Sequence, residues 1–123
     1  LVRYADDFVI LCRQGTDRPM EVIQKILKHL GLTLNAAKTH IVDVTQGSFD
    51  FLGSEIRIVR SWRTGGEYAN VQPSRKSLKT IKSRLTNMTR KELTPVPLED
   101  VIGNVNKVLR GWVAYFHYRN CSR

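Results

Sequence analysis

Two adjacent carboxylates, Asp6 and Asp7, are the residues near the start of the sequence that are best suited to chemistry. They interrupt two apolar arms, Leu1–Val2 and Phe8–Leu11, so we expect them on a tight turn between two strands, the second of which is buried on both faces. Two anions placed against a core destabilise a fold unless a cation or hydrogen-bond donors compensate. Because Mg²⁺ binds one or two carboxylates together with substrate phosphates, the pair favours a two-metal site for phosphoryl transfer. The alternative is a plain turn, which adjacent aspartates also favour.

Positive charge is concentrated in the second half of the sequence. The 123 residues include 20 Lys and Arg and 11 Asp and Glu, which gives a net charge of +9. Residues 1–56 hold six basic and seven acidic groups (net −1), whereas residues 57–123 hold fourteen and four (net +10). Residues 57–91 contain ten basic residues and a single acidic one, Glu67. A segment this basic repels itself unless an anion is near, so it predicts a nucleic-acid interface, with a solvated basic surface as the alternative.

Composition also bounds the size and the compartment. With 41% hydrophobic residues, a chain of this length suits one domain, or one and a half small ones, around a real core. No apolar run approaches the ~18–20 residues that span a bilayer. The helical part of the basic segment also lacks the Trp and Phe insertion residues of a membrane-surface helix, so we expect no membrane partner. Cys12 and Cys121 lack the spacing of a zinc site or a disulfide framework, which favours a reduced, intracellular compartment. Because the sequence opens on Leu1 in mid-pattern, we expect it to be part of a longer protein.

Short strands and one helix are expected to position the carboxylates. The helix begins at Thr16 or Asp17 and ends at Gly31, because apolar residues recur at helical spacing and glycine suits the left-handed C-terminal position. These apolar residues are Ile23, Ile26, Leu27 and Leu30. Strands are expected at 41–44, at 49–54 with a break at Gly53, and at 55–60 and 68–71 as the arms of a hairpin.

A basic helix is predicted after Pro73, with Ser74 as its N-cap. Four basic residues lie together on it, three of them within an arc of about 60° beside the apolar stripe. They are Arg75, Lys79, Lys82 and, just outside the arc, Lys76. No acid interrupts residues 75–90, whereas a merely soluble helix interleaves Glu with Lys, so this face favours contact with phosphates.

A last helix is predicted from about residue 98 to residue 119, with a long apolar stripe. Gly103 and Gly111 each destabilise a helix interior by ~1 kcal/mol, which indicates close helix packing or a kink. For Trp112, Tyr115 and Phe116 we expect packing in a core, with stacking against nucleic acid as the alternative.

These motifs and their order resemble a known family. Tyr4-Ala5-Asp6-Asp7 followed by an apolar strand resembles the catalytic palm motif of reverse transcriptases. The segment Leu30–Asn35 with Lys38-Thr39 resembles the one that places a lysine near the incoming nucleotide, and Phe49–Gly53 resembles the primer grip. The basic helix and the Gly111-Trp112…Tyr115-Phe116 segment resemble the thumb or maturase domain of group II intron-encoded reverse transcriptases. The resemblance covers nearly the whole chain, with the motifs in the family's order and spacing.

The resemblance implies a role for each of these residues. Asp6 is implied as a ligand of two catalytic Mg²⁺ ions, with Asp7 in support. Lys38 is implied to reach the triphosphate, as a charge partner or as a proton donor for the pyrophosphate. The residues implied beside the primer end or the incoming nucleotide are Tyr4, Ala5, Phe51, Leu52 and Gly53, the glycine because a backbone comes close there. Those implied against the template–primer backbone, where they position without reading sequence, are Arg75, Lys76, Lys79 and Lys82. Core packing is the alternative for Phe51, and an ordinary exposed lysine for Lys38.

We expect an α+β fold: a small antiparallel palm-type sheet with a packed helix, then a β-hairpin and a helical thumb-like subdomain. The C-terminal part of the palm is placed at 1–72 and the thumb or maturase region at 73–123. The implied activity is RNA-directed DNA synthesis in a bacterial-type cytoplasm. Its partners are an RNA template, a DNA primer, dNTP and intron RNA.

The sequence departs from the family's pattern in one respect. The family's palm takes a further Asp from an earlier strand, and its fingers bind nucleotide and template; neither has a counterpart in this sequence. We therefore predict that the chain alone does not polymerise DNA. The alternatives are a non-enzymatic RNA-binding maturase module, and a retron or CRISPR-associated reverse transcriptase. The Gly-Trp…Tyr-Phe ending favours the intron type.

Overall fold

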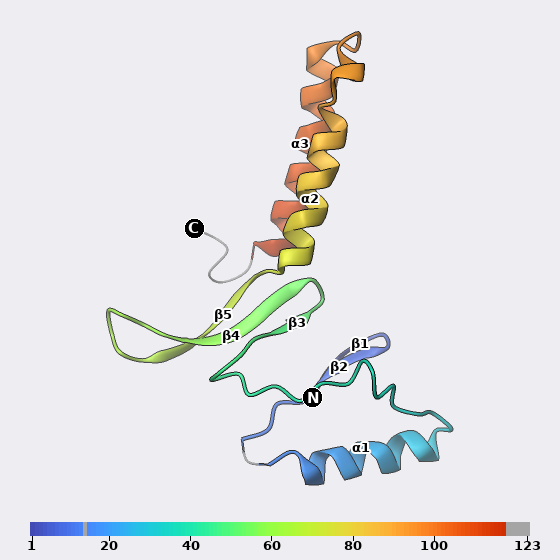
Figure 1. Cartoon of the computed structure of the whole chain (residues 1–123), viewed down its shortest axis with the longest axis vertical. Coiled ribbons are helices and arrows are strands. Elements are labelled where there is room, and N and C mark those ends of the chain that lie inside the picture. The colour runs from blue at the N-terminus through green and yellow to red at the C-terminus, as the bar shows by residue number, and fades with distance from the viewer. Residues whose placement is uncertain (14, 118–123) are drawn as a thin grey trace. The chain divides into compact units, whose positions relative to one another are not determined.

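The fold is α+β, as predicted, in a computed structural model that describes residues 1–13 and 15–117. Its elements in chain order are β1 (Val2–Tyr4), β2 (Asp7–Val9), α1 (Asp17–His29), β3 (Phe49–Phe51), β4 (Ser54–Arg60), β5 (Glu67–Pro73), α2 (Arg75–Met88), the 3-10 helix η1 (Lys91–Leu93) and α3 (Leu98–Phe116) (Figure 1). They belong to two compact units, Leu1–Val42 and a second that begins at Asp43. The boundary predicted near residue 72 lies inside the second unit, where β5 passes into α2, and stays a prediction.

The first unit opens with the predicted hairpin. β1 and β2 pair antiparallel, with Val2 opposite Val9 and Tyr4 opposite Asp7, so a two-residue loop joins them. Ala5 in this loop has a φ of 49°, in the left-handed region that two-residue hairpin loops use. The predicted burial of the second arm is wrong, because β2 ends at Val9 and Leu11 is 72% exposed. A two-stranded ribbon this short has no further strand or layer to cover its faces.

Helix α1 forms where the apolar spacing predicts it, and it ends as predicted at a left-handed glycine. Gly31 has a φ of 69°. The N–H of Leu32 donates to the Leu27 carbonyl at 2.8 Å and the N–H of Gly31 to the Lys28 carbonyl at 3.1 Å, which is a Schellman motif. Part of the apolar stripe remains open to solvent, since Ile26 is 53% exposed.

A three-stranded antiparallel sheet in the order β3-β4-β5 forms the base of the second unit. In the β4–β5 hairpin, Ser54 lies opposite Pro73 at one end and Arg60 opposite Glu67 at the other. The chain turns from β3 to β4 through Leu52-Gly53, with φ values of 49° and 75°. Positive φ at both central residues is the geometry of a type I′ turn, whose twist matches that of the flanking strands. The predicted break at Gly53 is therefore a hairpin turn.

The strand predicted at 41–44 is wrong. The Asp43 carbonyl accepts hydrogen bonds from the N–H groups of Gln46 and Gly47, and its carboxylate accepts from the N–H and the hydroxyl of Thr45. The two bonds to the carboxylate, that from the Thr45 hydroxyl foremost, lower the pKa of Asp43 below its ordinary value. Local side-chain bonds of this kind satisfy the backbone as a turn and compete with strand pairing.

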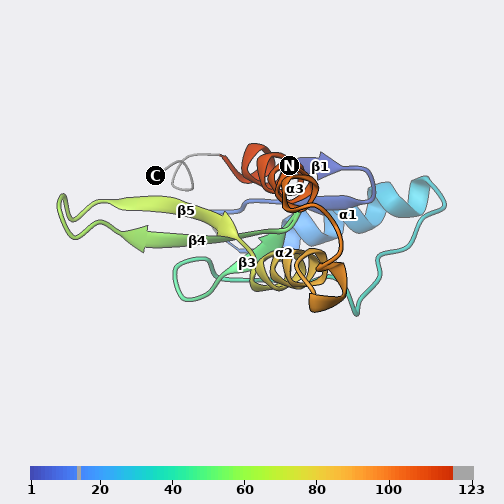
Figure 2. The same ribbon diagram turned by 90° about the horizontal axis from the view of Figure 1, so that it is seen from above.

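Helices α2 and α3 run side by side in opposite directions, joined through η1 (Figures 1 and 2). Ser74 is the N-cap of α2, as predicted, and its hydroxyl oxygen accepts from the N–H of Ser77 at 3.2 Å. A Cβ built at Gly103 or Gly111 meets no described atom beyond its own helix backbone within 4 Å. Of the two alternatives predicted for these glycines, close helix packing is therefore absent from the described structure, and a kink stays a prediction. The predicted end of the last helix, near residue 119, lies outside the described residues.

Burial is slight throughout the part of the chain that the structure describes. Ser74, 2% exposed, is the one buried residue there, and no hydrophobic side chain is buried. The expected core is therefore wrong. The helix pair and the sheet each present an apolar face, but a face is buried only when another layer covers it.

Glu55 of β4 makes the stability of the sheet depend on pH. Its carboxylate accepts hydrogen bonds from Gln72 Nε2 and from Ser48 Oγ, each at 2.7 Å. The bond from Gln72 first, and then that from Ser48, lowers the pKa of Glu55 below its ordinary value of 4.5. A depressed folded-state pKa adds stability above the unfolded-state value and loses it as the pH falls through the folded-state value.

We therefore expect the melting temperature to fall as the pH drops below 4.5, and to fall less in a Glu55→Gln variant. Thermal unfolding followed by circular dichroism at pH values above and below this point measures the difference. Glu92→Gln in the exposed η1 turn is the matched control. If Glu55→Gln and Glu92→Gln follow the same pH dependence, the Glu55 bonds do not contribute to acid sensitivity.

Candidate nucleic-acid interface

The two aspartates lie at the tip of the first hairpin, and both are exposed. Asp6 belongs to the loop, whereas Asp7 is the first residue of β2 and lies opposite Tyr4. The burial that the apolar arms predicted for them is wrong, so a burial penalty does not call for a cation here. What remains is the donor chemistry, two adjacent carboxylates with hard oxygen ligands. Within 1–13 and 15–117, no three or more His, Cys, Asp or Glu side chains form a group that could hold a metal ion.

The other residues predicted around the aspartates are also on the surface of the first unit. Tyr4 is 65% exposed on β1, and Ala5 is held by Arg3, whose Nε donates to the Ala5 carbonyl at 2.8 Å. Lys38 is exposed in a turn where its N–H donates to the Asn35 carbonyl at 3.0 Å. All are accessible to a large ligand, and their predicted roles stay predictions.

The Leu52-Gly53 turn is tied to both long helices of the second unit. The Gly53 carbonyl accepts from the N–H of Ser74 at 2.9 Å and from the hydroxyl of Ser77 at 2.8 Å. The Leu52 carbonyl accepts from the hydroxyl of Tyr115, near the end of α3, at 2.9 Å. The turn is thus fixed from the start of α2 and the end of α3. The group that lies close to Gly53 is the Ser77 side-chain hydroxyl, whereas the approach of a backbone expected at this glycine stays a prediction.

Gly53→Ala should destabilise the second unit by about 2 kcal/mol. A left-handed φ costs an alanine ~1–2 kcal/mol, and the bond lost at the Gly53 carbonyl is worth ~1 kcal/mol. The reason for the lost bond is steric, because an added Cβ lies 2.9 Å from Ser77 Oγ. Urea unfolding followed by circular dichroism measures the change in the free energy of unfolding.

Gly103→Ala is the matched control for that substitution. Gly103 lies in α3 with open space at its Cβ position among the described residues. Alanine there is expected to stabilise by ~1 kcal/mol, since glycine is the poorer helix former. Equal effects of the two substitutions would contradict a special role of the Leu52-Gly53 turn.

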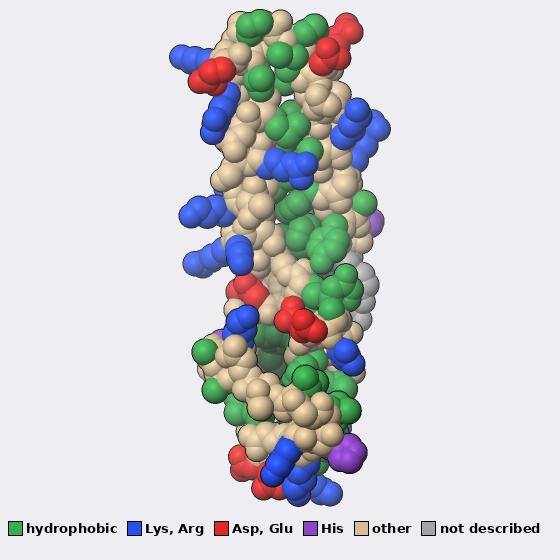
Figure 3. Space-filling view, turned by 90° about the vertical axis from the view of Figure 1, so that its right-hand side faces the viewer, with side chains coloured by type: hydrophobic (Ala, Val, Ile, Leu, Met, Phe, Trp, Pro, Cys, Tyr) green, Lys and Arg blue, Asp and Glu red, His purple; other side chains and the backbone are tan. Residues whose placement is uncertain are grey.

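The basic residues predicted on α2 are brought together as expected. Arg75, Lys76, Lys79 and Lys82 are all exposed. Figure 3 shows Lys and Arg side chains spaced along α2, with hydrophobic side chains gathered between this helix and α3. Arg75 and Lys76 occupy the first turn, where the helix dipole disfavours cations and favours an anion. The helix therefore presents a positive face that a polyanion would stabilise.

Comparison with protein families bears on this same part of the chain. Residues 78–123 match the family model described as the group II intron, maturase-specific domain. A search of curated proteins found no match to the chain.

The match covers most of the helical part of the second unit. The matched residues contain most of α2 and all of α3, including Lys79, Lys82 and Tyr115. The match thus includes part of the positive face of α2. In the described part of the chain, no helix has the length and apolar character needed to cross a membrane.

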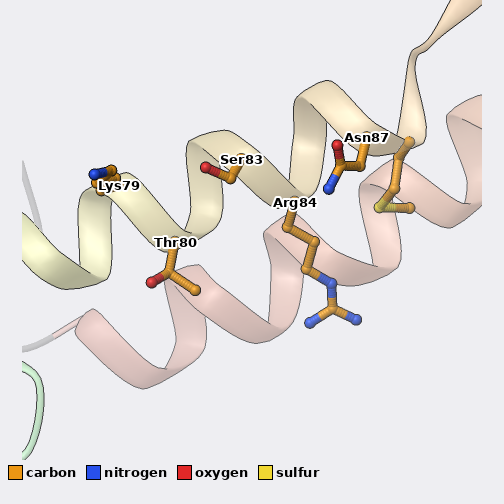
Figure 4. A pocket seen from close by; sticks show the side chains of 6 residues that line it. Lys79, Thr80, Ser83, Arg84 and Asn87 are labelled. Carbon is orange, nitrogen blue, oxygen red and sulfur yellow. The ribbon is translucent and has the colours of Figure 1, made fainter.

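Sequence reasoning missed a set of mostly polar residues in the part of α2 that the family model matches. They line a shallow pocket on α2 together with Lys79 and are Thr80, Ser83, Arg84, Asn87 and Met88 (Figure 4). Their spacing by three and four residues is the signal that predicts a shared helix face. Hydroxyl and amide groups beside two cations suit the phosphate and sugar oxygens of a nucleic-acid backbone.

The aromatic residues near the end of α3 fall into two groups. Trp112 and Phe116 are half-buried and their ring centroids lie 4.8 Å apart, so they pack on each other, without the buried core that was predicted. Tyr115 is 63% exposed, packs edge-on against Phe116 and donates its hydroxyl hydrogen bond to the Leu52 turn. Ring-to-ring contact within α3 therefore describes the first two, and Tyr115 connects α3 to the β3–β4 turn.

Proposed function

We propose that the chain is part of an RNA-directed DNA polymerase of the group II intron type, which binds its intron RNA through α2. The observation that carries the proposal is the bonding of the Leu52-Gly53 turn, the predicted primer grip, to Ser77 and Tyr115. Tyr115 lies in the maturase-specific domain, and Ser77 immediately precedes it. A predicted polymerase element is thereby held by maturase helices in a single compact unit.

The hairpin tip supports the catalytic half of the proposal through its chemistry. Asp6 and Asp7 supply the hard carboxylate oxygens that Mg²⁺ prefers, and their exposure leaves room for substrate phosphates as further ligands. The residues fit such ions in donor type, while a further carboxylate has to come from another strand. When bound, two Mg²⁺ ions supply charge stabilisation to the attacking and the leaving oxygens of phosphoryl transfer.

Within that reaction, this chain's own residues would position the primer end and stabilise the charge of the leaving group. A primer 3′-hydroxyl attacks the α-phosphorus of a dNTP, a phosphodiester bond forms and pyrophosphate leaves. Lys38 would balance the charge of the leaving pyrophosphate. Leu52 and Gly53 would hold the primer end at a turn whose position is fixed by hydrogen bonds, which is the kind of positioning that accelerates a bimolecular step.

RNA binding by the chain itself is the first test. We expect intron RNA to bind the chain with a log affinity that falls steeply with log salt concentration, with a slope of about −3 if four phosphates are contacted. Filter binding or fluorescence anisotropy over a salt series measures the slope. A flat slope, or no binding at low salt, would refute the RNA-binding half of the proposal.

A non-enzymatic maturase module is the second candidate. The exposed positive face of α2 and the match to the maturase-specific domain support it without any use of Asp6 or Asp7. The two candidate functions differ in whether they require Asp6 and Asp7, because assisting RNA folding needs no carboxylates at this hairpin. Primer extension, described in the Discussion, separates them.

A further inference from the structure

The loop between β4 and β5 carries an aromatic side chain that the fold does not use. Trp62 is 91% exposed, although tryptophan is among the residues that proteins bury most extensively on average. It lies between Ser61 and Gly66, at the end of the hairpin opposite α2 (Figures 1 and 2). A partner that covers this indole removes its apolar surface from water, and this favours binding.

The loop that presents Trp62 is held by its own hydrogen bonds. Ser61 and Gly66 are joined backbone to backbone at 2.8 Å, and the N–H of Gly65 donates to the Ser61 carbonyl at 2.8 Å. Arg60 closes over the loop, with its Nε donating to the Gly65 carbonyl at 2.9 Å. None of these bonds involves the indole, so the loop positions Trp62 without covering it.

The surroundings of Trp62 are cationic. The Arg63 guanidinium carbon lies 5.7 Å from the centroid of the indole ring, a cation–π contact, and both side chains are exposed. Within residues 57–91, Glu67 is the one acidic residue. An exposed aromatic ring beside an arginine is the combination that binds single-stranded nucleic acid, by base stacking and phosphate contact.

Resting on the proposed function, we propose that the Ser61–Gly66 loop binds single-stranded RNA, with an unpaired base stacked on Trp62 and a phosphate contacted by Arg63. β5 separates this loop from the positive face of α2 by seven residues, roughly 23 Å at ~3.3 Å per residue. A single RNA molecule spans that distance. The loop therefore takes the unpaired part of an RNA whose backbone lies along α2.

The test compares single-stranded and duplex RNA of the same length, about 20 nucleotides, on the full chain by fluorescence anisotropy. Trp62→Ala should weaken binding of the single strand by about tenfold and leave duplex binding within about twofold, because a paired base is not free to stack. Trp62→Phe should restore most of the affinity. Arg63→Ala should lower the salt slope for the single strand by about 0.7, whereas Trp62→Ala should leave the slope unchanged.

A spectroscopic readout identifies the residue directly. The chain has two tryptophans, so a Trp112→Phe variant leaves Trp62 as the one indole. Its fluorescence should be quenched as single-stranded RNA is added and should respond little to duplex RNA. Anionic lipid vesicles serve as the competing partner. A blue shift with vesicles but no response to RNA would replace the RNA assignment with a lipid surface and overturn the proposal.

The outcomes separate this proposal from the function on which it rests. If the unmodified chain binds RNA and Trp62→Ala binds both RNAs equally well, the loop proposal is refuted and the function stands. If the unmodified chain binds no RNA at low salt, both are refuted. Loss of affinity for duplex and single strand alike in Trp62→Ala would mean that the substitution acts on the fold, which refutes stacking.

Discussion

Replacing the four basic residues on the positive face of α2 by alanine is expected to weaken binding of intron RNA by about a thousandfold at about 0.1 M salt. Each phosphate contact contributes ~0.7–0.9 to the slope of log affinity against log salt concentration. Losing four such contacts removes about 3 from that slope, which is about a thousandfold at 0.1 M relative to 1 M salt. The replaced residues are Arg75, Lys76, Lys79 and Lys82. Anisotropy titrations over a salt series measure both quantities.

The matched control removes the same number of charges elsewhere. Arg13, Arg18, Lys25 and Lys28 are exposed and lie in the first unit, before the positive face. Their replacement by alanine leaves the same net charge as the α2 variant. We expect a loss of affinity of less than about tenfold, because charges that make no direct contact act through a screened field. If the two variants lose equal affinity, binding follows net charge and the α2 face is not the interface.

The second large effect is expected at the first hairpin. In a longer protein that supplies the remainder of the polymerase, Asp6→Asn should reduce DNA synthesis on an RNA template by about a thousandfold or more. A lost metal ligand removes several kcal/mol of transition-state stabilisation, and each 1.36 kcal/mol is about tenfold in rate. Primer extension with Mg²⁺ measures the rate, and anisotropy confirms that RNA affinity is unchanged. Asp17→Asn at the start of α1 is the control.

Each outcome of primer extension decides between the candidate functions. Extension by the unmodified protein and by Asp17→Asn, but not by Asp6→Asn, would establish a polymerase with its metal ligand at Asp6. Equal extension by all of them would show that Asp6 is not a ligand of the catalytic metal ions. No extension by any of them, with RNA binding retained, would favour the maturase module that has no polymerase activity.

Local chemistry made several features of the structure predictable. The left-handed position after α1 needed a residue without a Cβ, and Gly31 marked it. Ser74 marked the start of α2, since a hydroxyl before a helical pattern caps its free N–H groups. The exposed basic arc on α2 followed from helical geometry alone, because residues three and four apart share a face.

Burial was predicted poorly, and for one physical reason. Phe8–Leu11 has the apolar run of a strand covered on both faces, yet Leu11 is 72% exposed. The segment 41–44 has strand-like side chains, yet the Asp43 carboxylate and carbonyl close a turn there. Apolar pattern shows which faces can be covered, whereas coverage depends on a second layer and on competing local hydrogen bonds.

The sequence by itself determined the α+β class, the end of α1 at Gly31 and the start of α2 at Ser74. It also determined the charge of α2 and the place of Asp6 and Asp7 at the turn of the first hairpin. These follow from side-chain type and from spacing along one element. Only the tertiary structure decided that Ser77 and Tyr115 bind the two carbonyls of the Leu52-Gly53 turn, and that Trp62 is left uncovered. The reason is that such contacts join residues 24 and 63 positions apart, whose meeting depends on how strands and helices pack.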